Sequence, residues 1–402
     1  MTHRAHQEKL PPELKHLAGA GHLPVLRELL SSLHQRYPNP NRKLHYDELV
    51  LWFLLACFNP VLKSLRAIQF ASTFQGVQER TQLPRFALGS FSEASHVFDP
   101  ELLHDVFTQL ARRVASRNAP EPPDSLPPEL VVLAADASVW ALLPRMARVF
   151  YSQPLTRRRK GEFKGHFLFD VLKGIPVDAA LDPADERHVL PTQLSAQVLY
   201  VLDRGYFSSA LYAQITAAQA FFVARTKDCI AFEVLEEREL TQDDRAAGVQ
   251  RDALIRWNSQ SLRLVVAERR SPPPSNLHPK QKNGKHRARS RFSATTQTWF
   301  LLTNRLDLAA RDVVLIYSYR WHIETFFRWL KCVIDCRHFF SENENGFALQ
   351  LYATLIASLL VTLYTGLKPK RRLWEALCLY FSGWATLEDL HRVIATFKDN
   401  SS

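Results

Sequence analysis

A proline-rich stretch divides this chain of 402 residues into two parts with different patterns of apolar residues. It reads NAPEPPDSLPP at residues 118–128, and proline cannot continue a helix. Before it, apolar residues recur with helical spacing, as in 46–58. After it come short apolar runs typical of strands, such as 129–135 and 197–202. The sequence therefore predicts helices before the stretch and an α/β domain after it.

The predicted organisation has four parts. A helical domain at 1–118 is followed by a linker at 119–128, an α/β domain at 129–367 with a strand-rich insertion at about 221–300, and a helical tail at 368–402. Residues 349–367 form an apolar run long enough to span a membrane. This run contains Gln350 with several Ser and Thr residues and follows an amphipathic helix, so we predict a buried core helix and no membrane partner.

Charge and cysteine content indicate the class of binding partner and the cellular compartment. Lys and Arg total 51 against 40 acidic residues, a net charge of +11 that favours a polyanionic partner. Residues 269–291 contain eight Lys and Arg residues and no acid, which fits either a solvated loop or a loop lying on a nucleic acid backbone. Five scattered cysteines fit a reducing cytosol, and a start without an apolar leader argues against secretion, so we predict a cytoplasmic protein.

One segment carries a narrow stripe of functional side chains. Residues 317–331, YSYRWHIETFFRWLK, contain no proline or glycine and predict one continuous helix. On that helix Tyr317, Arg320, Glu324 and Lys331 would share a stripe about 60° wide. The alternative is an ordinary salt-bridged surface, with Arg320 and Glu324 as an i,i+4 pair.

Two further carboxylates qualify as partners of Glu324. Asp136 and Asp203 each end a strand-like run and are predicted to enter a turn, where sheet proteins present side chains to ligands. Each taken alone could simply be a turn former. Together the three carboxylates could bind two Mg²⁺ ions through oxygen ligands and support phosphoryl transfer.

These residues carry a family resemblance. The spacing Tyr317-x2-Arg320-x3-Glu324-x6-Lys331 is similar to the YREK signature of a large group of bacterial insertion-sequence DDE transposases. Segments 203–206 (DRGY), 136–138 (DAS) and 299–303 (WFLLT) also resemble that family around its first two aspartates and before its glutamate helix. The resemblance covers about residues 130–365.

The resemblance implies a fold, a site and cofactors. The fold would be a ribonuclease-H-like mixed sheet with flanking helices, bearing Asp136, Asp203 and Glu324 as catalytic residues and as ligands of two Mg²⁺ ions, which Mn²⁺ could replace. The residues implied to contact DNA are Tyr317, Arg320, Lys331, Trp299, Arg204 and Trp321. Of these, Trp299 would stack on a base flipped from the transposon end, although a core tryptophan is the equal alternative.

The implied activity is Mg-dependent hydrolysis at transposon ends followed by strand transfer. The partners would be double-stranded DNA, as terminal inverted repeats and target, and a second copy of the chain in the synaptic complex. A nuclease with the same core and an inactive transposase-derived DNA-binding protein remain as alternatives. Segment 81–97, with Ser90, Ser92 and Ser95, is a candidate reader of the ends. Cys332, Cys336 and His338 lack a fourth ligand and are not interpreted as a zinc site.

Overall fold

The computed structural model describes residues 23–39, 41–59, 61–117, 123, 125–141, 162–181, 190, 193–227, 230–271, 295–332, 340–341, 343–381 and 384–399. Half of the predicted linker 119–128 lies outside the described residues, as do most of the basic segment 269–291 and the positions of Cys336 and His338.

The chain forms two compact units, each built from segments distant in sequence. The first unit comprises Met1–Pro120, Ala137–Pro183 and His322–Ser402, and the second comprises Glu121–Asp136 and Ala184–Trp321. The chain therefore passes between the units four times, after Pro120, Asp136, Pro183 and Trp321.

Nine strands are hydrogen-bonded in the order β3-β2-β1-β4-β5-β9-β8-β7-β6. Strand β1 is parallel to β4, and β4 is parallel to β5. The antiparallel pairs are β2–β3, β5–β9, β9–β8, β8–β7 and β7–β6. The bounds are β1 Val132–Ala141, β2 Glu162–Asp170, β3 Ile175–Leu181, β4 Leu199–Leu202, β5 Phe221–Arg225, β6 Glu233–Glu237, β7 Val249–Trp257, β8 Gln260–Ser271 and β9 Thr295–Thr303. This mixed sheet with its helices confirms the predicted α/β class and is consistent with a ribonuclease-H-like core.

Along the sequence, helices come before the first strand, between strands and after the last strand. Before it come α1 (Leu23–Arg36), α2 (Tyr46–Phe58), α3 (Leu65–Ala71), α4 (Gln75–Thr81), α5 (Leu88–Val97) and α6 (Pro100–Arg117). Between strands come the short helix η3 (Arg204–Tyr206), α8 (Ser209–Ala217) and α9 (Gln242–Ala246). After the last strand follow α10 (Ala310–Ser318), α11 (Trp321–Cys332), α12 (Glu344–Thr365), α13 (Arg371–Phe381) and α14 (Leu387–Asp399).

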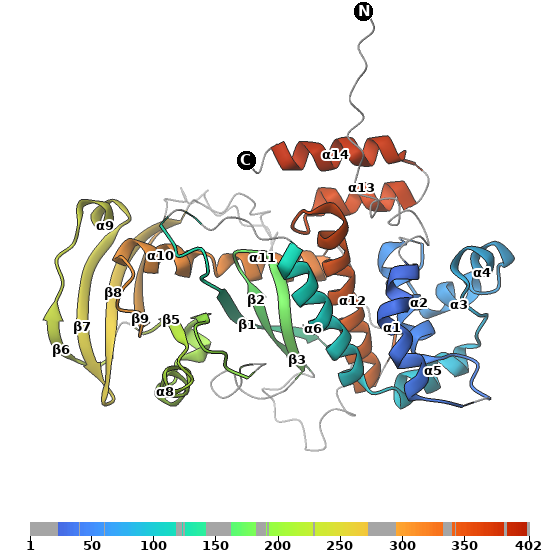
Figure 1. The fold of residues 1–402 in the computed structure, drawn as a ribbon, viewed down its shortest axis with the longest axis horizontal. Coiled ribbons are helices and arrows are strands. Elements are labelled where there is room, and N and C mark those ends of the chain that lie inside the picture. Colours follow the sequence, from blue (N-terminus) through green and yellow to red (C-terminus); the bar gives the residue numbers. More distant parts are fainter. Residues whose placement is uncertain are drawn as a thin grey trace, which may run out of the picture. The chain divides into compact units, whose positions relative to one another are not determined.

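Helix α12 forms the core of the first unit, where it packs on α6, α2 and β3 (Figure 1). It is long and apolar enough to cross a membrane, yet its most apolar window is wholly buried inside the protein. Its buried hydroxyls donate to carbonyls of its own preceding turns, as Thr354 does to Gln350 and Thr365 to Val361. Because the polar groups are thereby satisfied, the helix suits a protein core. The prediction of a buried core helix is confirmed.

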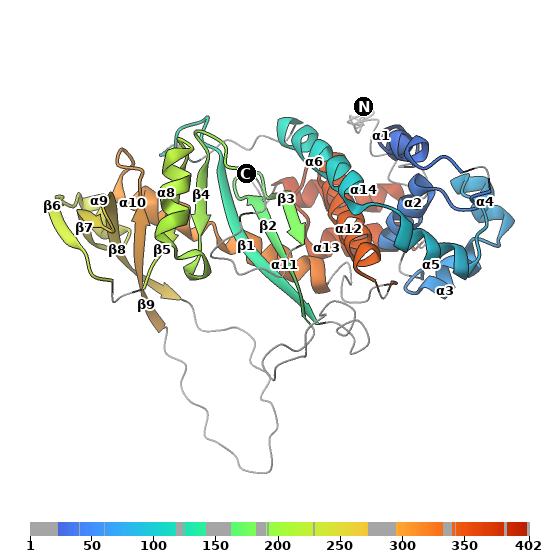
Figure 2. The same cartoon turned by 90° about the horizontal axis from the view of Figure 1, so that it is seen from below.

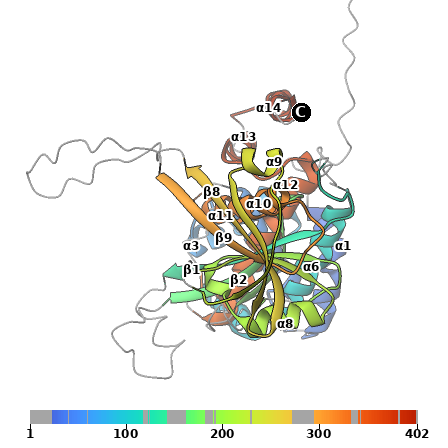
Figure 3. The ribbon, with the colours of Figure 1, turned by 90° about the vertical axis from the view of Figure 1, so that its left-hand side faces the viewer.

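In the second unit, the parallel strands β4 and β5 pack with α8 (Figure 2). All four residues of β4 are buried, as expected of a strand covered on both faces. From β5 the sheet continues into the long antiparallel strands β9, β8 and β7, which twist strongly in Figure 3.

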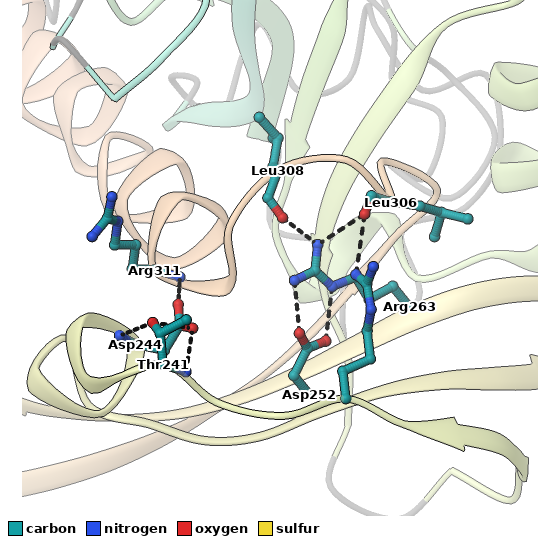
Figure 4. A network of polar contacts seen from close by, with 8 residues as sticks. Thr241, Asp244, Asp252, Arg263, Leu306, Leu308 and Arg311 are labelled. Carbon is teal, nitrogen blue, oxygen red and sulfur yellow. Dashed lines mark hydrogen bonds and ion pairs between the residues drawn. The ribbon is translucent and has the colours of Figure 1, made fainter.

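A buried ion pair joins these antiparallel strands to the start of α10 (Figure 4). Arg263 on β8 donates from Nε and Nη2 to the two carboxylate oxygens of Asp252 on β7, at 2.8 and 2.7 Å. Its Nη1 donates to the carbonyl of Leu308 at 2.5 Å, just before α10 begins. Asp244 in α9 adds a second tie by accepting the backbone N–H of Arg311 at 2.9 Å. Both contacts fix the helix that carries Tyr317.

Candidate active site

The two aspartates lie side by side on neighbouring parallel strands. In the register of β1 with β4, Ala135 pairs with Leu202, so Asp136 and Asp203 are the next residues on the two strands. Adjacent strands are about 4.7–4.9 Å apart, and residues in register point to the same face. The prediction that Asp136 ends its strand is wrong, because β1 continues to Ala141. Asp203 does follow the last residue of β4, at a turn.

The carboxylate of Asp203 is oriented by the turn that follows it. Asp203 is the N-cap of η3, and its Oδ1 accepts the backbone N–H of Gly205 at 2.7 Å. Its negative charge helps to raise the pKa of both Tyr212 and Tyr317, although burial is the larger cause for each phenol. The turn therefore orients this carboxylate through Oδ1.

Arg320 forms an ion pair with Asp136. Its Nη1 donates to Oδ2 of Asp136 at 3.2 Å, and both side chains are only 17% exposed. The charge of Arg320 also acts to lower the pKa of the Tyr317 phenol, against the larger effect of burial, which raises it. The structure thus brings Arg320 to a residue 184 positions away, a contact that sequence spacing does not indicate.

The predicted single helix over 317–331 is wrong. Helix α10 ends at Ser318 and α11 begins at Trp321, so Tyr317 and Glu324 lie on different helices and Arg320 lies in the turn between them. The N–H of Arg320 bonds to the carbonyl of Tyr317 at 3.1 Å, a tight i to i−3 turn. The helical stripe computed for one continuous helix therefore does not exist.

Trp299 and Tyr317 form a half-open aromatic contact. Their ring centroids are 4.9 Å apart at 76°, and the guanidinium of Arg269 lies 5.2 Å from the Trp299 ring. Tyr317 is 3% exposed, whereas Trp299 is half-buried and donates from its indole N–H to Gln297 at 3.2 Å. Trp299 is therefore not a fully buried core residue.

Sequence reasoning missed Arg225 at the end of β5. Its charge acts to lower the pKa of Tyr317, which places the two side chains close together, and its Nε is buried without a hydrogen-bond partner. The neighbouring Thr226 accepts a bond through its carbonyl from Nε of Arg204 at 3.3 Å. A signal existed in the sequence, because Arg225 ends an apolar run at the same sheet edge as Asp203.

The remaining predicted residues lie at the start of α11 or in the first unit. Trp321, the last residue of the second unit, is 55% exposed. Glu324 occupies the first turn of α11. Lys331, in the last turn, donates to the carbonyl of Val139 at 2.7 Å and lies 4.7 Å from the ring of Trp140.

The donors present suit a hard divalent cation. Asp136 and Asp203 offer carboxylate oxygens at one sheet edge, which are the ligands that Mg²⁺ and Mn²⁺ prefer. Within the described ranges, no three His, Cys, Asp or Glu side chains are gathered closely enough to hold an ion. The two aspartates belong to the second unit and Glu324 to the first.

The candidate DNA-reading segment 81–97 is helical only from Leu88, and one of its serines is not accessible. Ser95 is 1% exposed and shares hydrogen bonds with Ser341 at 3.2 Å and Asn343 at 2.9 Å. The prediction that Ser95 is available for polar contacts with DNA is wrong. Ser92 is exposed and Ser90 is half-buried.

Comparison with known proteins identifies the class. Residues 127–360 match the family model of the transposase DDE domain. The chain therefore belongs to this family, which confirms the resemblance to bacterial insertion-sequence transposases. Families of DDE transposases generally use divalent metal ions.

Two relatives agree with the family. The y4zB protein of Sinorhizobium fredii, which carries a transposase name, is 31% identical over 160 residues, or 39% of this chain and 40% of that protein. A protein of Geobacillus stearothermophilus named as a transposase for insertion sequence element IS5377 is 24% identical over 338 residues, or 81% of this chain and 78% of that protein. The chain thus spans less than half of the first relative's length.

A solved structure of the piggyBac transposase synaptic complex with hairpin DNA aligns with 98% of this chain and 83% of that chain, at 10% identity. The TM-score is 0.36, which is too low to establish a common fold.

Proposed function

We propose that this chain cuts DNA at the ends of an insertion sequence and joins those ends to target DNA, with Asp136, Asp203 and Glu324 as its catalytic carboxylates. The observation that carries the proposal is the register of β1 with β4, which sets Asp136 beside Asp203 inside a transposase DDE domain. Glu324 is assigned by the spacing Tyr317-x2-Arg320-x3-Glu324-x6-Lys331.

The three carboxylates would hold one or, by our preference, two divalent ions. Such ions would activate the attacking oxygen and stabilise the leaving oxygen of a phosphodiester. The backbone N–H of Gly205 fixes the orientation of the Asp203 carboxylate for this task.

The cations near the aspartates would hold DNA phosphates. Guanidinium groups bind phosphate oxygens through paired N–H donors, which fits Arg320, while Lys331 would act as a point charge. Because Tyr317 is buried and the charge of Arg320 acts on its phenol, we assign it the task of positioning that guanidinium. The exposed Arg204 is a further phosphate contact in this proposal.

Two tryptophans would contact bases. Trp299 is half-buried, and its ring already has an arginine over it and a tyrosine at its edge, so a flipped base would extend an existing aromatic cluster. Trp321 is exposed at the start of α11 and offers a second aromatic surface.

A cleavage assay on DNA that carries the terminal repeats flanking the gene tests the catalytic assignment. Asp136→Asn, Asp203→Asn and Glu324→Gln should each abolish end cleavage, since carboxamides bind divalent ions poorly. DNA affinity measured without metal should stay within about threefold for Asp203→Asn and Glu324→Gln. Mn²⁺ should replace Mg²⁺, whereas Ca²⁺ should support binding without cleavage. Full cleavage by any of the three variants would remove that residue from the site.

The same assay separates the alternatives. Cleavage without joining of the free 3′ ends to target DNA would indicate a nuclease. Binding of the ends without cleavage in either metal would indicate an inactive DNA-binding protein.

The phosphate assignment is tested by binding at several salt concentrations. Loss of a charge-assisted phosphate contact costs about 1.5–3 kcal/mol, or roughly ten- to hundredfold in affinity. Arg320→Ala and Lys331→Ala should each weaken binding to that extent and reduce the salt slope by about one per contact. Glu324→Gln is the control, with cleavage lost and the salt slope unchanged. An unchanged slope in both alanine variants would refute the phosphate assignment.

We further propose that the N-terminal helices recognise the transposon ends. The loop before α2 and helix α5 enclose a hollow of about 350 Å³. Arg42 and Lys43 line it from the loop and Ser90 from the helix, and the guanidinium of Arg42 lies 4.9 Å from the ring of Phe98. A cationic hollow with hydroxyl and amide donors suits a DNA backbone.

Lys43→Gln in the full-length protein tests this assignment. It should weaken binding to terminal-repeat DNA by about tenfold and reduce the salt slope by about one, because one phosphate contact is lost. Arg112→Gln, which removes an equal charge from α6 outside the hollow, is the control. Equal effects of both variants would mean that the hollow has no special role.

The proposed assembly and location follow from the reaction. Joining two ends at one target requires two active sites, so we propose a homodimer on paired ends and action on DNA in the bacterial cytoplasm. Mass measurement of the complex with terminal-repeat DNA should give two chains per pair of ends, and one chain per pair would refute the dimer.

A further inference from the structure

The contact between Arg320 and Asp136 joins two groups that the proposed function needs apart. Nη1 of Arg320 donates to Oδ2 of Asp136 at 3.2 Å. A divalent ion bound by Asp136 would use a carboxylate oxygen, and a DNA phosphate bound by Arg320 would use guanidinium donors. The ion and Arg320 therefore compete for Asp136, while the phosphate and Asp136 compete for Arg320.

The residues around the Arg320–Asp136 ion pair shield it from solvent. Both side chains are 17% exposed, so their attraction is screened less than that of a surface pair. Tyr317 is buried and packs against Trp299, and its carbonyl accepts the backbone N–H of Arg320 at 3.1 Å, which fixes the turn that carries Arg320.

The position of Arg320 also permits it to change partners. It lies in the turn between α10 and α11 and not inside either helix. A long side chain in a turn can move its guanidinium from a carboxylate to a phosphate without a change in the flanking helices.

We infer that the Arg320–Asp136 pair is an exchange contact that couples metal binding to DNA binding. Without DNA, Arg320 occupies Asp136 and weakens the binding of a divalent ion. When a DNA phosphate takes Arg320, the carboxylate becomes available, so DNA increases the metal affinity and the metal increases the DNA affinity by the same factor. The inference rests on the proposed function, because it requires that Asp136 binds metal.

The consequence is a site that assembles on its substrate. A transposase that held its ions tightly before binding an end could hydrolyse any DNA it met. Exchange of one arginine between a carboxylate and a phosphate would restrict the complete metal site to the DNA complex.

Mn²⁺ binding to the full-length protein, followed by electron paramagnetic resonance without DNA, tests the exchange. Arg320→Gln should bind Mn²⁺ about tenfold more tightly than wild type, since a competing charge-assisted hydrogen bond is removed. Arg225→Gln is the matched control, because it removes an equal charge near Tyr317 that has no ion pair with Asp136 among the described contacts. It should tighten Mn²⁺ binding by less than about threefold through general electrostatics alone.

A second measurement adds DNA. The probe is a short duplex of the terminal sequence flanking the gene, supplied with its 3′ end already free so that no hydrolysis occurs. Wild type should gain Mn²⁺ affinity with this duplex, and Arg320→Gln should gain markedly less. Arg320→Lys, which keeps the charge at Asp136, should bind Mn²⁺ close to wild type without DNA. Misfolding of a variant would lower its affinity, so the expected increase cannot arise from that cause.

Two results would overturn the inference, and they differ. If Arg320→Gln binds Mn²⁺ no more tightly than Arg225→Gln, or shows the full wild-type gain with DNA, the exchange is wrong while the metal site stands. If Asp203→Asn binds Mn²⁺ as tightly as wild type, the metal assignment itself fails and the exchange fails with it.

Discussion

The buried ion pair of the second unit makes a sharp stability prediction. Arg263 and Asp252 are 2% and 6% exposed, and Arg263 also serves the carbonyl of Leu308. Arg263→Met fits the same volume but leaves a buried carboxylate and a buried carbonyl without their donor. Removal of one partner of such a pair costs about 3–5 kcal/mol, because an uncompensated charge stays buried. At about 2–4 °C per kcal/mol for a unit of this size, the unfolding temperature should fall by roughly 10 °C.

Thermal and urea unfolding followed by circular dichroism measure this effect. The control is Arg256→Met, which breaks an exposed ion pair between β7 and β6 of the same sheet. Arg256 and Glu233 are 55% and 62% exposed at 3.1 Å, so their loss should cost less than about 1 kcal/mol. The double variant Asp252→Leu/Arg263→Met should recover most of the lost stability, since no charge is then left buried.

Equal small effects of Arg263→Met and Arg256→Met would refute the reasoning. They would mean that burial adds nothing to the pair. A double variant as unstable as Arg263→Met alone would show that packing, and not the unpaired charge, causes the loss.

Three further outcomes are expected. The His104 ring nitrogen Nε2 lies 2.7 Å from Oδ1 of Asp178, and this contact raises the pKa of the imidazole. The pair therefore stabilises the fold fully below the unfolded pKa of about 6.5, and this stabilisation is lost as the pH rises through the folded pKa. His104→Gln should lower the urea midpoint more at about pH 5.5 than at about pH 8.5, and an equal loss at both pH values would contradict this. Tyr317→Phe should slow end cleavage in the gel assay through Arg320 while leaving the unfolding temperature within a few degrees, and wild-type cleavage would remove its positioning role. Ser95→Ala should cost about 1 kcal/mol in urea unfolding without changing DNA affinity in a gel shift, because its hydroxyl is buried in a protein network, and a loss of affinity would restore it as a DNA contact.

Much of the architecture was predictable because it follows from local patterns. The apolar run at 349–367 contains Ser and Thr residues whose hydroxyls can bond to carbonyls of the same helix, so it can be buried, and α12 is that helix. The strand-like runs before Asp136 and Asp203 pair as parallel neighbours, as their buried residues require. The identities and spacing of Tyr317, Arg320 and Glu324 are properties of the sequence, so they indicate the family without knowledge of the fold.

The conformation of the site residues was not predictable, because long-range contacts decide it. Periodicity over 317–331 favours one helix, and no glycine or proline contradicts that. Only the tertiary structure shows the turn at Arg320, where Tyr317 packs against Trp299 and the guanidinium reaches Asp136. Such contacts outweigh a propensity difference of under about 1 kcal/mol per residue.

The sequence by itself therefore determined the class of protein, its three candidate acids and the α/β class of its fold. The tertiary structure alone decided which charges meet. An i,i+4 rule pairs Arg320 with Glu324, but the sheet brings Asp136 to the same guanidinium from 184 residues away. A pairing at such separation depends on strand register and helix ends, which are fixed by the packing of the whole second unit and not by any local segment.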